Sequence, residues 1–273
     1  MISAAPVDVG RAGEGPAALI VVTPGMPVGA YGRLVRTLEQ HGLDAWMLSF
    51  PPEAQDPTAM VDAEIPGALA AVRGARGGAR KVALVGHGLG GRLAAASVAS
   101  GHARPDALAL LGAPLDLASL GEEPEALIGW LAALPVLTGD LDLSTLTLDS
   151  WKGMPVLPLL LGDPPPTLGV VSGAWLASLA AEVGPGHAIS LATAPCPVWE
   201  GASPSDNLAP PETVRASLGG GTFVRFGYLH LDPREPDHMG LLSDPIPVDA
   251  LVAWTAHALN KNSRQRSAIS DQR

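Results

Sequence analysis

The feature that most constrains the fold is a glycine-rich turn that joins a predicted strand to a predicted helix. Lys81–Val85 is the strand, Gly86–Gly91 (GHGLGG) is the turn, and Leu89–Ser100 is the helix. A short apolar run bounded by glycines is typical of a strand buried on both faces, as in a parallel sheet. Glycines let the backbone turn sharply and let strand and helix approach closely. A tight strand–turn–helix unit is therefore expected here.

Predicted strands and helices alternate along most of the chain. Further strands are predicted at Ala18–Thr23, Asp44–Phe50, Ala107–Leu111, Pro197–Gly201 and Thr222–Tyr228. Further helices are predicted at Tyr31–Leu38, from Asp56-Pro57 onward with a kink at Pro66-Gly67, at Pro211–Leu218 and at Val248–Asn260. Because alternating strands and helices build a parallel sheet covered on both faces, the predicted fold class is α/β, with a doubly wound, mostly parallel sheet.

The alternation stops after Asp116 and resumes near residue 195. The segment between is rich in leucine, holds three tryptophans and has irregularly spaced prolines. It is predicted to be an inserted helical lid. The expected organisation is a core of residues 1–116 and 195–260, a lid of residues 117–194, and a polar, flexible tail of residues 261–273.

Charge and hydropathy exclude several classes of function. With 17 Lys+Arg against 27 Asp+Glu, the net charge of −10 makes nucleic acid and anionic membrane surfaces poor partners. No apolar stretch reaches the ~18 residues of a membrane span, and the N-terminus lacks a signal-peptide pattern.

Cys196 is the one cysteine, so no intrachain disulfide can form, and a cytoplasmic location is expected. No residue cluster has metal-ligand spacing, so no metal or cofactor is predicted.

Four sequence segments together resemble the α/β hydrolases. In that superfamily a strand leads through G-x-S-x-G into a helix; here Gly86 and Gly90 match the outer glycines. Leu110–Asp116 (LLGAPLD) is similar to the strand that follows this turn. Cys196–Gly201, followed by Asp206–Pro211, is similar to the strand and loop that present the catalytic acid, and Asp237–Leu242 (DHMGLL) to the loop that presents the histidine. The pattern is closest to polyhydroxyalkanoate synthase-like and lipase-like hydrolases.

The resemblance implies a role for each matching position. Gly88 stands where the family has its nucleophilic serine. His238 would be the base and Asp206 the acid that orients it, with the exact acid left open within Ser203–Asp206. The N–H groups of Leu89 and Met26 would be the oxyanion-hole donors.

His87 stands beside the nucleophile position, where a packing role is favoured over ligand binding. The same glycines also match G-x-G-x-x-G at Gly86, Gly88 and Gly91, which a dinucleotide site would use. The acidic residue about 20 positions on, Asp106, precedes the next strand instead of ending it. The dinucleotide interpretation is therefore the weaker one.

Glycine at position 88 removes the attacking oxygen, so ordinary serine-type hydrolysis is not expected. We expect a non-hydrolytic protein that binds a hydrophobic small molecule, such as an apolar carbonyl compound or acyl group. The alternative is an enzyme (hydrolase, lyase or cyclase) in which His238 and Asp206 activate water or the substrate directly. A third hypothesis is an assembly role, with a protein partner or as a homo-oligomer.

Overall fold

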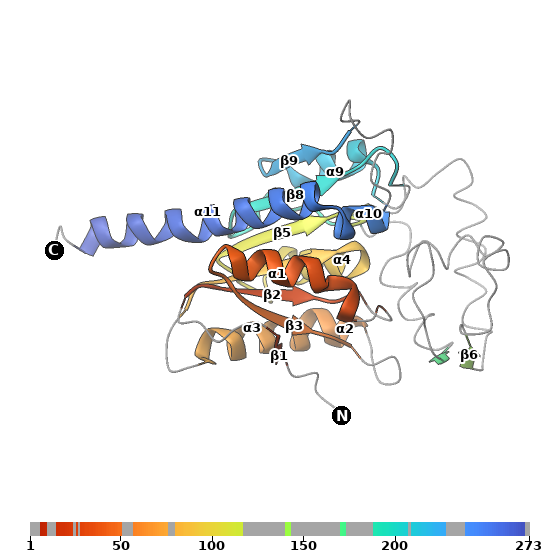
Figure 1. Ribbon diagram of the computed structural model, residues 1–273, viewed down its shortest axis with the longest axis horizontal. Coiled ribbons are helices and arrows are strands. Elements are labelled where there is room, and N and C mark those ends of the chain that lie inside the picture. The colour runs from red at the N-terminus through yellow and green to blue at the C-terminus, as the bar shows by residue number, and fades with distance from the viewer. Residues whose placement is uncertain are drawn as a thin grey trace.

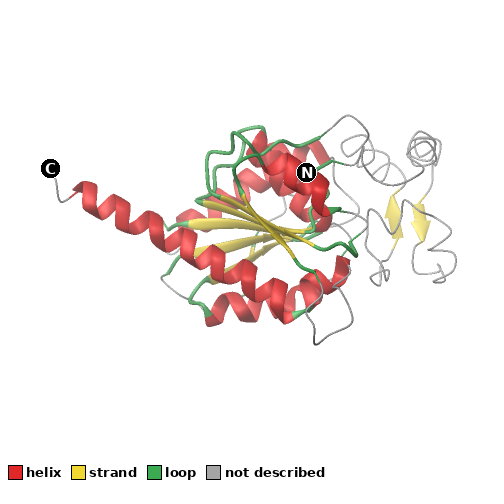
Figure 2. Ribbon diagram, turned by 90° about the horizontal axis from the view of Figure 1, so that it is seen from above, coloured by secondary structure: helices red, strands yellow, loops and turns green. Residues whose placement is uncertain are grey.

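The computed structural model describes residues 6–9, 15–23, 26, 28–50, 57–75, 80–116, 140–142, 170–172, 188–206, 209–227 and 238–270. For 140–142, 170–172, 238–239 and 261–270 it describes the backbone alone. Figure 1 shows the central sheet face-on, with helices in front of it and behind it, and Figure 2 shows the same layers from above.

The sheet confirms the predicted α/β, doubly wound arrangement. Within the described residues it has seven strands in the order β1-β3-β2-β4-β5-β8-β9. The bounds are β1 Val7–Asp8, β2 Ala17–Val21, β3 Asp44–Leu48, β4 Val82–His87, β5 Ala107–Leu111, β8 Val198–Ala202 and β9 Thr222–Arg225. β1 pairs antiparallel with β3, and the other neighbouring pairs are parallel.

The central strands are buried on both faces, which explains their nearly continuous apolar sequences. Alternate side chains of each strand enter one of two cores. Leu19, Leu84 and Leu108 pack with α3 (Ile65–Gly74), α4 (Gly88–Ala99) and α9 (Pro211–Leu218). Ile20, Val85 and Ala109 pack with α1 (Gly32–Gln40), α10 (His238–Ser243) and α11 (Pro245–Ser270).

The predicted kink at Pro66-Gly67 takes the form of a wide turn. The helix starts with α2 (Pro57–Ala59), passes through a π-helical turn at Met60–Glu64 and continues as α3. The N–H of Ile65 bonds to the carbonyl oxygen of Met60, five residues back. Because Pro66 has no N–H, the regular hydrogen-bond pattern is interrupted at this point, and the wider turn accommodates it.

Three predicted element ends differ from the structure by three residues or more. β9 ends at Arg225 and does not reach Tyr228. α11 starts at Pro245, three residues before the predicted start, and continues to Ser270, ten residues beyond the predicted end at Asn260. Lysine, arginine, glutamine and alanine in the last turns are good helix formers, so the backbone stays helical where no packing pattern predicts it.

Most of the predicted lid lies outside the described residues. Within 117–194 the structure describes β6 (Asp140–Asp142) and β7 (Val170–Ser172), which pair antiparallel, and residues 188–194. Residues 188–194 run along the core: the Ile189 N–H donates to the Leu115 carbonyl oxygen at 2.8 Å.

Candidate functional site

The candidate site is built around a sharp turn between β4 and α4, residues Gly86–Gly91, called here the Gly88 turn. His87 ends β4 in an extended conformation, with φ −126° and ψ 141°. Gly88 then takes φ +53° and starts the helix. Left-handed backbone costs a residue with a side chain about 1–2 kcal/mol, and glycine avoids this cost. The strand–turn–helix unit expected from the sequence is confirmed, and glycine at position 88 suits its geometry.

The two outer glycines allow the close packing of the turn. A Cβ on Gly86 would lie 2.7 Å from the Gly91 nitrogen, which is backbone that cannot move aside easily. A Cβ on Gly90 would lie 2.8 Å from the nitrogen of Thr23 and would overlap the carbonyl oxygen of Val21. Only glycine fits at both positions, so the spacing of these two glycines follows from close contact between β4, α4 and the end of β2.

Thr23, just after β2, ties the Gly88 turn to the neighbouring strand. Its hydroxyl donates to the His87 carbonyl oxygen at 2.7 Å and accepts from the Gly90 N–H at 3.2 Å. Its own N–H donates to the hydroxyl of buried Tyr31 at 2.9 Å, and burial raises the pKa of that phenol. Sequence reasoning placed Thr23 only as a strand end, because these contacts join residues 64 and 67 positions apart.

The two expected oxyanion donors differ in their surroundings. Leu89, 4% exposed, lies in the first turn of α4, where an N–H has no acceptor inside its own helix. No described residue outside the helix accepts a hydrogen bond from the Leu89 N–H either. The Met26 N–H donates to the Thr23 carbonyl oxygen at 2.9 Å, so it is engaged in a turn. Leu89 is thus the better placed of the two donors.

Asp206 and His87 are both buried near the carboxyl ends of strands. Asp206, 1% exposed, follows β8; its Oδ1 accepts the Ala209 N–H at 3.2 Å. Its backbone N–H donates to the Ser203 carbonyl oxygen at 3.0 Å, which closes a tight turn. His87, 1% exposed, is the last residue of β4 and lies opposite Leu111 of β5.

His238 is the first residue of α10, which follows β9 in the chain. Its side chain lies outside the described atoms, so its contact with Asp206 stays a prediction. The positions of Gly88, Asp206 and His238 follow β4, β8 and β9, which all run parallel in one half of the sheet, in the order β4-β5-β8-β9. Carboxyl ends of parallel strands meet at one edge, where open α/β sheets bind ligands. The three positions thus lie at the same end of the sheet, where Figure 1 shows α10 beside the strand ends.

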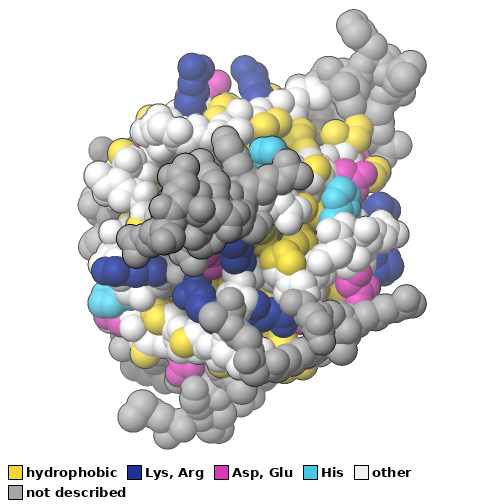
Figure 3. All heavy atoms as spheres, turned by 90° about the vertical axis from the view of Figure 1, so that its left-hand side faces the viewer, with side chains coloured by type: hydrophobic (Ala, Val, Ile, Leu, Met, Phe, Trp, Pro, Cys, Tyr) yellow, Lys and Arg dark blue, Asp and Glu magenta, His cyan; other side chains and the backbone are white. Residues whose placement is uncertain are grey.

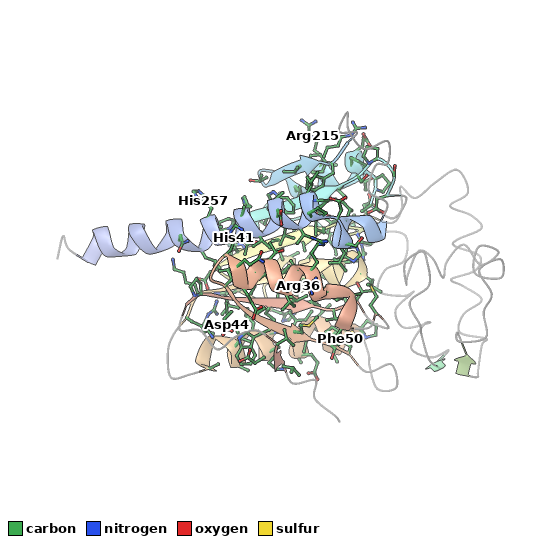
Figure 4. All side chains as sticks on the ribbon, viewed as in Figure 1. Arg36, His41, Asp44, Phe50, Arg215 and His257 are labelled. Atoms are coloured by element: carbon green, nitrogen blue, oxygen red, sulfur yellow. The ribbon has the colours of Figure 1, made fainter. Side chains whose placement is uncertain are left out.

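A hollow of about 480 Å³ lies at the opposite, amino end of the sheet. It is lined by residues that include Cys196, Val198, Thr222, Trp254 and His257. Figure 3 looks at this end of the molecule, where hydrophobic side chains reach the surface among charged ones. Figure 4 shows His257 on the outer side of α11, and Asp44 and Phe50 near opposite ends of β3. The hollow is separate from the Gly88 turn, because Val198 and Thr222 begin their strands.

The described residues offer neither a metal-ligand cluster nor a membrane-spanning helix. No group of three or more His, Cys, Asp or Glu in that part of the chain could hold a metal ion. None of its helices combines the length and hydropathy needed to cross a membrane.

Comparisons with known proteins place the fold. No protein-family model matches the chain, and no curated protein matches it in sequence. Solved structures do match. A monoacylglycerol lipase from Paleococcus ferrophilus aligns with TM-score 0.59 and 17% identity, over 94% of this chain and 100% of that one. DcsB, solved with a substrate analogue, aligns with TM-score 0.62 and 16% identity, over 92% and 91%.

A lipase-esterase related protein from Clostridium acetobutylicum aligns with TM-score 0.59 and 12% identity, over 93% of this chain and 99% of that one. Sequence identities this low show the fold and leave the activity open. The chain has the α/β-hydrolase fold, as the sequence resemblance implied. What it does with that fold depends on its own residues.

Proposed function

We propose that this protein binds an apolar carbonyl or acyl ligand beside the Gly88 turn and does not hydrolyse it by a serine mechanism. The observation that carries the proposal is Gly88 itself, at φ +53° between β4 and α4. In α/β hydrolases this turn exposes the nucleophilic serine. Glycine keeps the turn and removes the attacking oxygen. In a serine protease such a loss lowers kcat about 10⁶-fold.

The rest of the turn supports a retained binding site. Thr23 fixes the first turn of α4 against β2, and no described residue accepts the Leu89 N–H, which would then serve a ligand oxygen. The N-terminus of a helix favours partial negative charge, such as that on a carbonyl oxygen. Leucines and tryptophans of residues 117–194, as a lid, would supply the apolar wall. Several solved structures with this fold are lipases or esterases, which favours an ester-like or acyl ligand.

A second candidate function is catalysis without a serine. Asp206 is 1% exposed and hydrogen bonded at the position where the resemblance puts the acid. A protein that only binds ligand has no need of an oriented acid and a histidine. In this alternative His238, oriented by Asp206, removes a proton from water or from the substrate.

The decisive experiment compares ester hydrolysis by the wild-type protein and by Gly88→Ser. A panel of activated esters from short to long acyl chains would be used, with Gly88→Ser/His238→Ala as the control. We expect turnover by Gly88→Ser alone, and none by the double variant. Turnover by the wild-type protein that disappears in His238→Ala would overturn the binding proposal and establish the second candidate. If neither protein turned over any ester, the hydrolase-like site on which both candidate functions depend would be refuted.

A further inference from the structure

Glu200 is a buried acid in the middle of β8 that the proposed function does not use. It is fully buried, and its Oε1 accepts the Ala113 N–H at 2.9 Å. Its Oε2 has no hydrogen-bond partner among the described residues. Leu110 and Phe223 lie opposite it on the two neighbouring strands. A carboxylate is costly in such apolar surroundings unless an opposite charge lies beside it.

Ala113 belongs to a short segment that packs against the Gly88 turn. Gly112 takes φ +54°, and its N–H donates to the Gly201 carbonyl oxygen at 2.8 Å. A Cβ added to Gly91 would lie 2.9 Å from the Cβ of Ala113. Pro114, next in the chain, offers its carbonyl oxygen to Arg92 Nη1 of α4 at 2.6 Å. The carboxyl of Glu200 thus holds a segment that touches the first turns of α4.

We propose that Glu200 is a positioning residue of the site, which as a neutral carboxylic acid fixes residues 112–114 against α4. The proposal rests on the proposed function in one respect, namely that the Gly88 turn is where a ligand binds. Glu200 would act through Ala113, without touching the ligand.

Burial is the main influence that favours the neutral form of Glu200. Burial raises its pKa well above the usual value; the hydrogen bond from Ala113 lowers it, and the charge of Asp206 raises it further. On α4, Arg92 is bonded to the Pro114 carbonyl oxygen. On α9, Glu212 and Arg215 are exposed to solvent.

Asp106 offers a comparison within the same sheet. Like Glu200 it accepts a backbone N–H: its Oδ2 bonds to that of Val82 at 3.0 Å. Unlike Glu200, it has a cation beside it, because Arg73 Nη2 lies 2.9 Å from the same oxygen. Asp106 therefore has a counter-ion for its charge at the amino end of the sheet, whereas the described structure pairs no cation with Glu200.

The first test measures unfolding by denaturant from pH 5 to pH 9 for the wild type, Glu200→Gln and the control Asp106→Asn. Glutamine keeps an oxygen for the Ala113 N–H and cannot ionise. The wild type binds a proton at Glu200 when folded and loses it when unfolded. This contribution to stability is full below the unfolded pKa of about 4.3 and falls as pH rises toward the raised folded pKa.

We therefore expect the ratio of the folding equilibrium constants, Glu200→Gln over wild type, to rise with pH by up to about tenfold per unit. An equal rise in the ratio for Asp106→Asn over wild type would show that the pH dependence does not come from Glu200 and would count against the neutral-acid role. A constant ratio from pH 5 to pH 9 would overturn the neutral-acid role. This measurement needs no catalytic activity, so it can succeed or fail independently of the proposed function.

The second test examines positioning in the Gly88→Ser background. Glu200→Met removes the acceptor, so hydrogen exchange of the Ala113 amide should accelerate and kcat should fall, while Glu200→Gln preserves both at pH 6. At higher pH, where Glu200 of the Gly88→Ser parent begins to ionise, the pH profile of kcat should differ between Glu200→Gln and the parent. An unchanged Ala113 exchange rate in Glu200→Met would refute positioning. If that variant does not fold, the pH profile of Glu200→Gln decides, and a profile identical to the parent's refutes it.

Discussion

The hydroxyl of Thr23 accepts the N–H of Gly90 at 3.2 Å, across the gap between the end of β2 and the first turn of α4. The first N–H groups of a helix have no acceptor within the helix, so a buried one needs a partner from elsewhere. Thr23 supplies it from a neighbouring strand, and the same hydroxyl holds the last carbonyl group of β4. The turn that carries the candidate site is thus fixed from β2.

Thr23→Val should destabilise the protein by about 1–3 kcal/mol, because it leaves the buried Gly90 N–H without an acceptor. The free energy of unfolding in urea measures the effect. Thr255→Val is the matched control: Thr255 is also fully buried, but its hydroxyl donates to the Leu251 carbonyl oxygen of its own helix. Removing that hydroxyl leaves no buried N–H without an acceptor, so the control should lose less stability. Equal losses in the two variants would argue against the Thr23 contact.

Gly90→Ala should be severely destabilising. The added methyl would overlap the Val21 carbonyl oxygen and lie 2.8 Å from the Thr23 nitrogen, and backbone atoms cannot move aside cheaply. We expect a loss at or above about 3 kcal/mol, the upper range for overpacking a core. Gly67→Ala on α3 meets nothing within 4 Å and should gain about 0.5–1 kcal/mol, as in an ordinary helix. A Gly90→Ala protein as stable as the wild type would be inconsistent with this packing.

Gly88→Ala tests the backbone geometry of the turn. At φ +53° an alanine should cost about 1–2 kcal/mol from the left-handed conformation. Gly101→Ala is the control, because Gly101 has φ +81° in open space just after α4. Any loss at position 88 beyond that at position 101 measures crowding in the site. Thermal unfolding of both variants gives the comparison, and a stabilised Gly88→Ala would contradict the positive φ.

Local patterns in the sequence were sufficient to predict most of the sheet. β2, β4 and β5 are continuous apolar runs bounded by turn residues, and the structure places each close to its predicted range. β9 was harder, because it lies at the edge with half-exposed residues and its apolar pattern does not stop where the pairing stops. The end of α11 was missed because helix continues there without an apolar stripe to mark it.

The candidate site was predictable where one segment determines it and not where distant segments meet. The glycine spacing predicted the Gly88 turn, because close packing at Gly86 and Gly90 excludes a side chain. Thr23 and Glu200 carried no such pattern, since their roles depend on hydrogen bonds across 67 and 87 residues of sequence. One signal was present for Glu200: a lone acid inside an otherwise apolar predicted strand. The roles of His238 and Asp206 stay predictions.

Cys196 should react slowly with thiol reagents in the native protein. Burial, and secondarily the negative charge of Asp106, raise the pKa of its thiol to about 11. Because the thiolate is the reactive form, at pH 8 its reaction should be about a hundredfold or more slower than that of a free cysteine of pKa about 8.5. The rate should rise about tenfold per pH unit up to pH 10, in proportion to the thiolate fraction. Since the chain has one cysteine, the signal from a chromogenic disulfide reagent needs no assignment. The same protein in urea is the control and should react at the ordinary rate, whereas an equally fast native reaction at pH 8 would contradict the raised pKa.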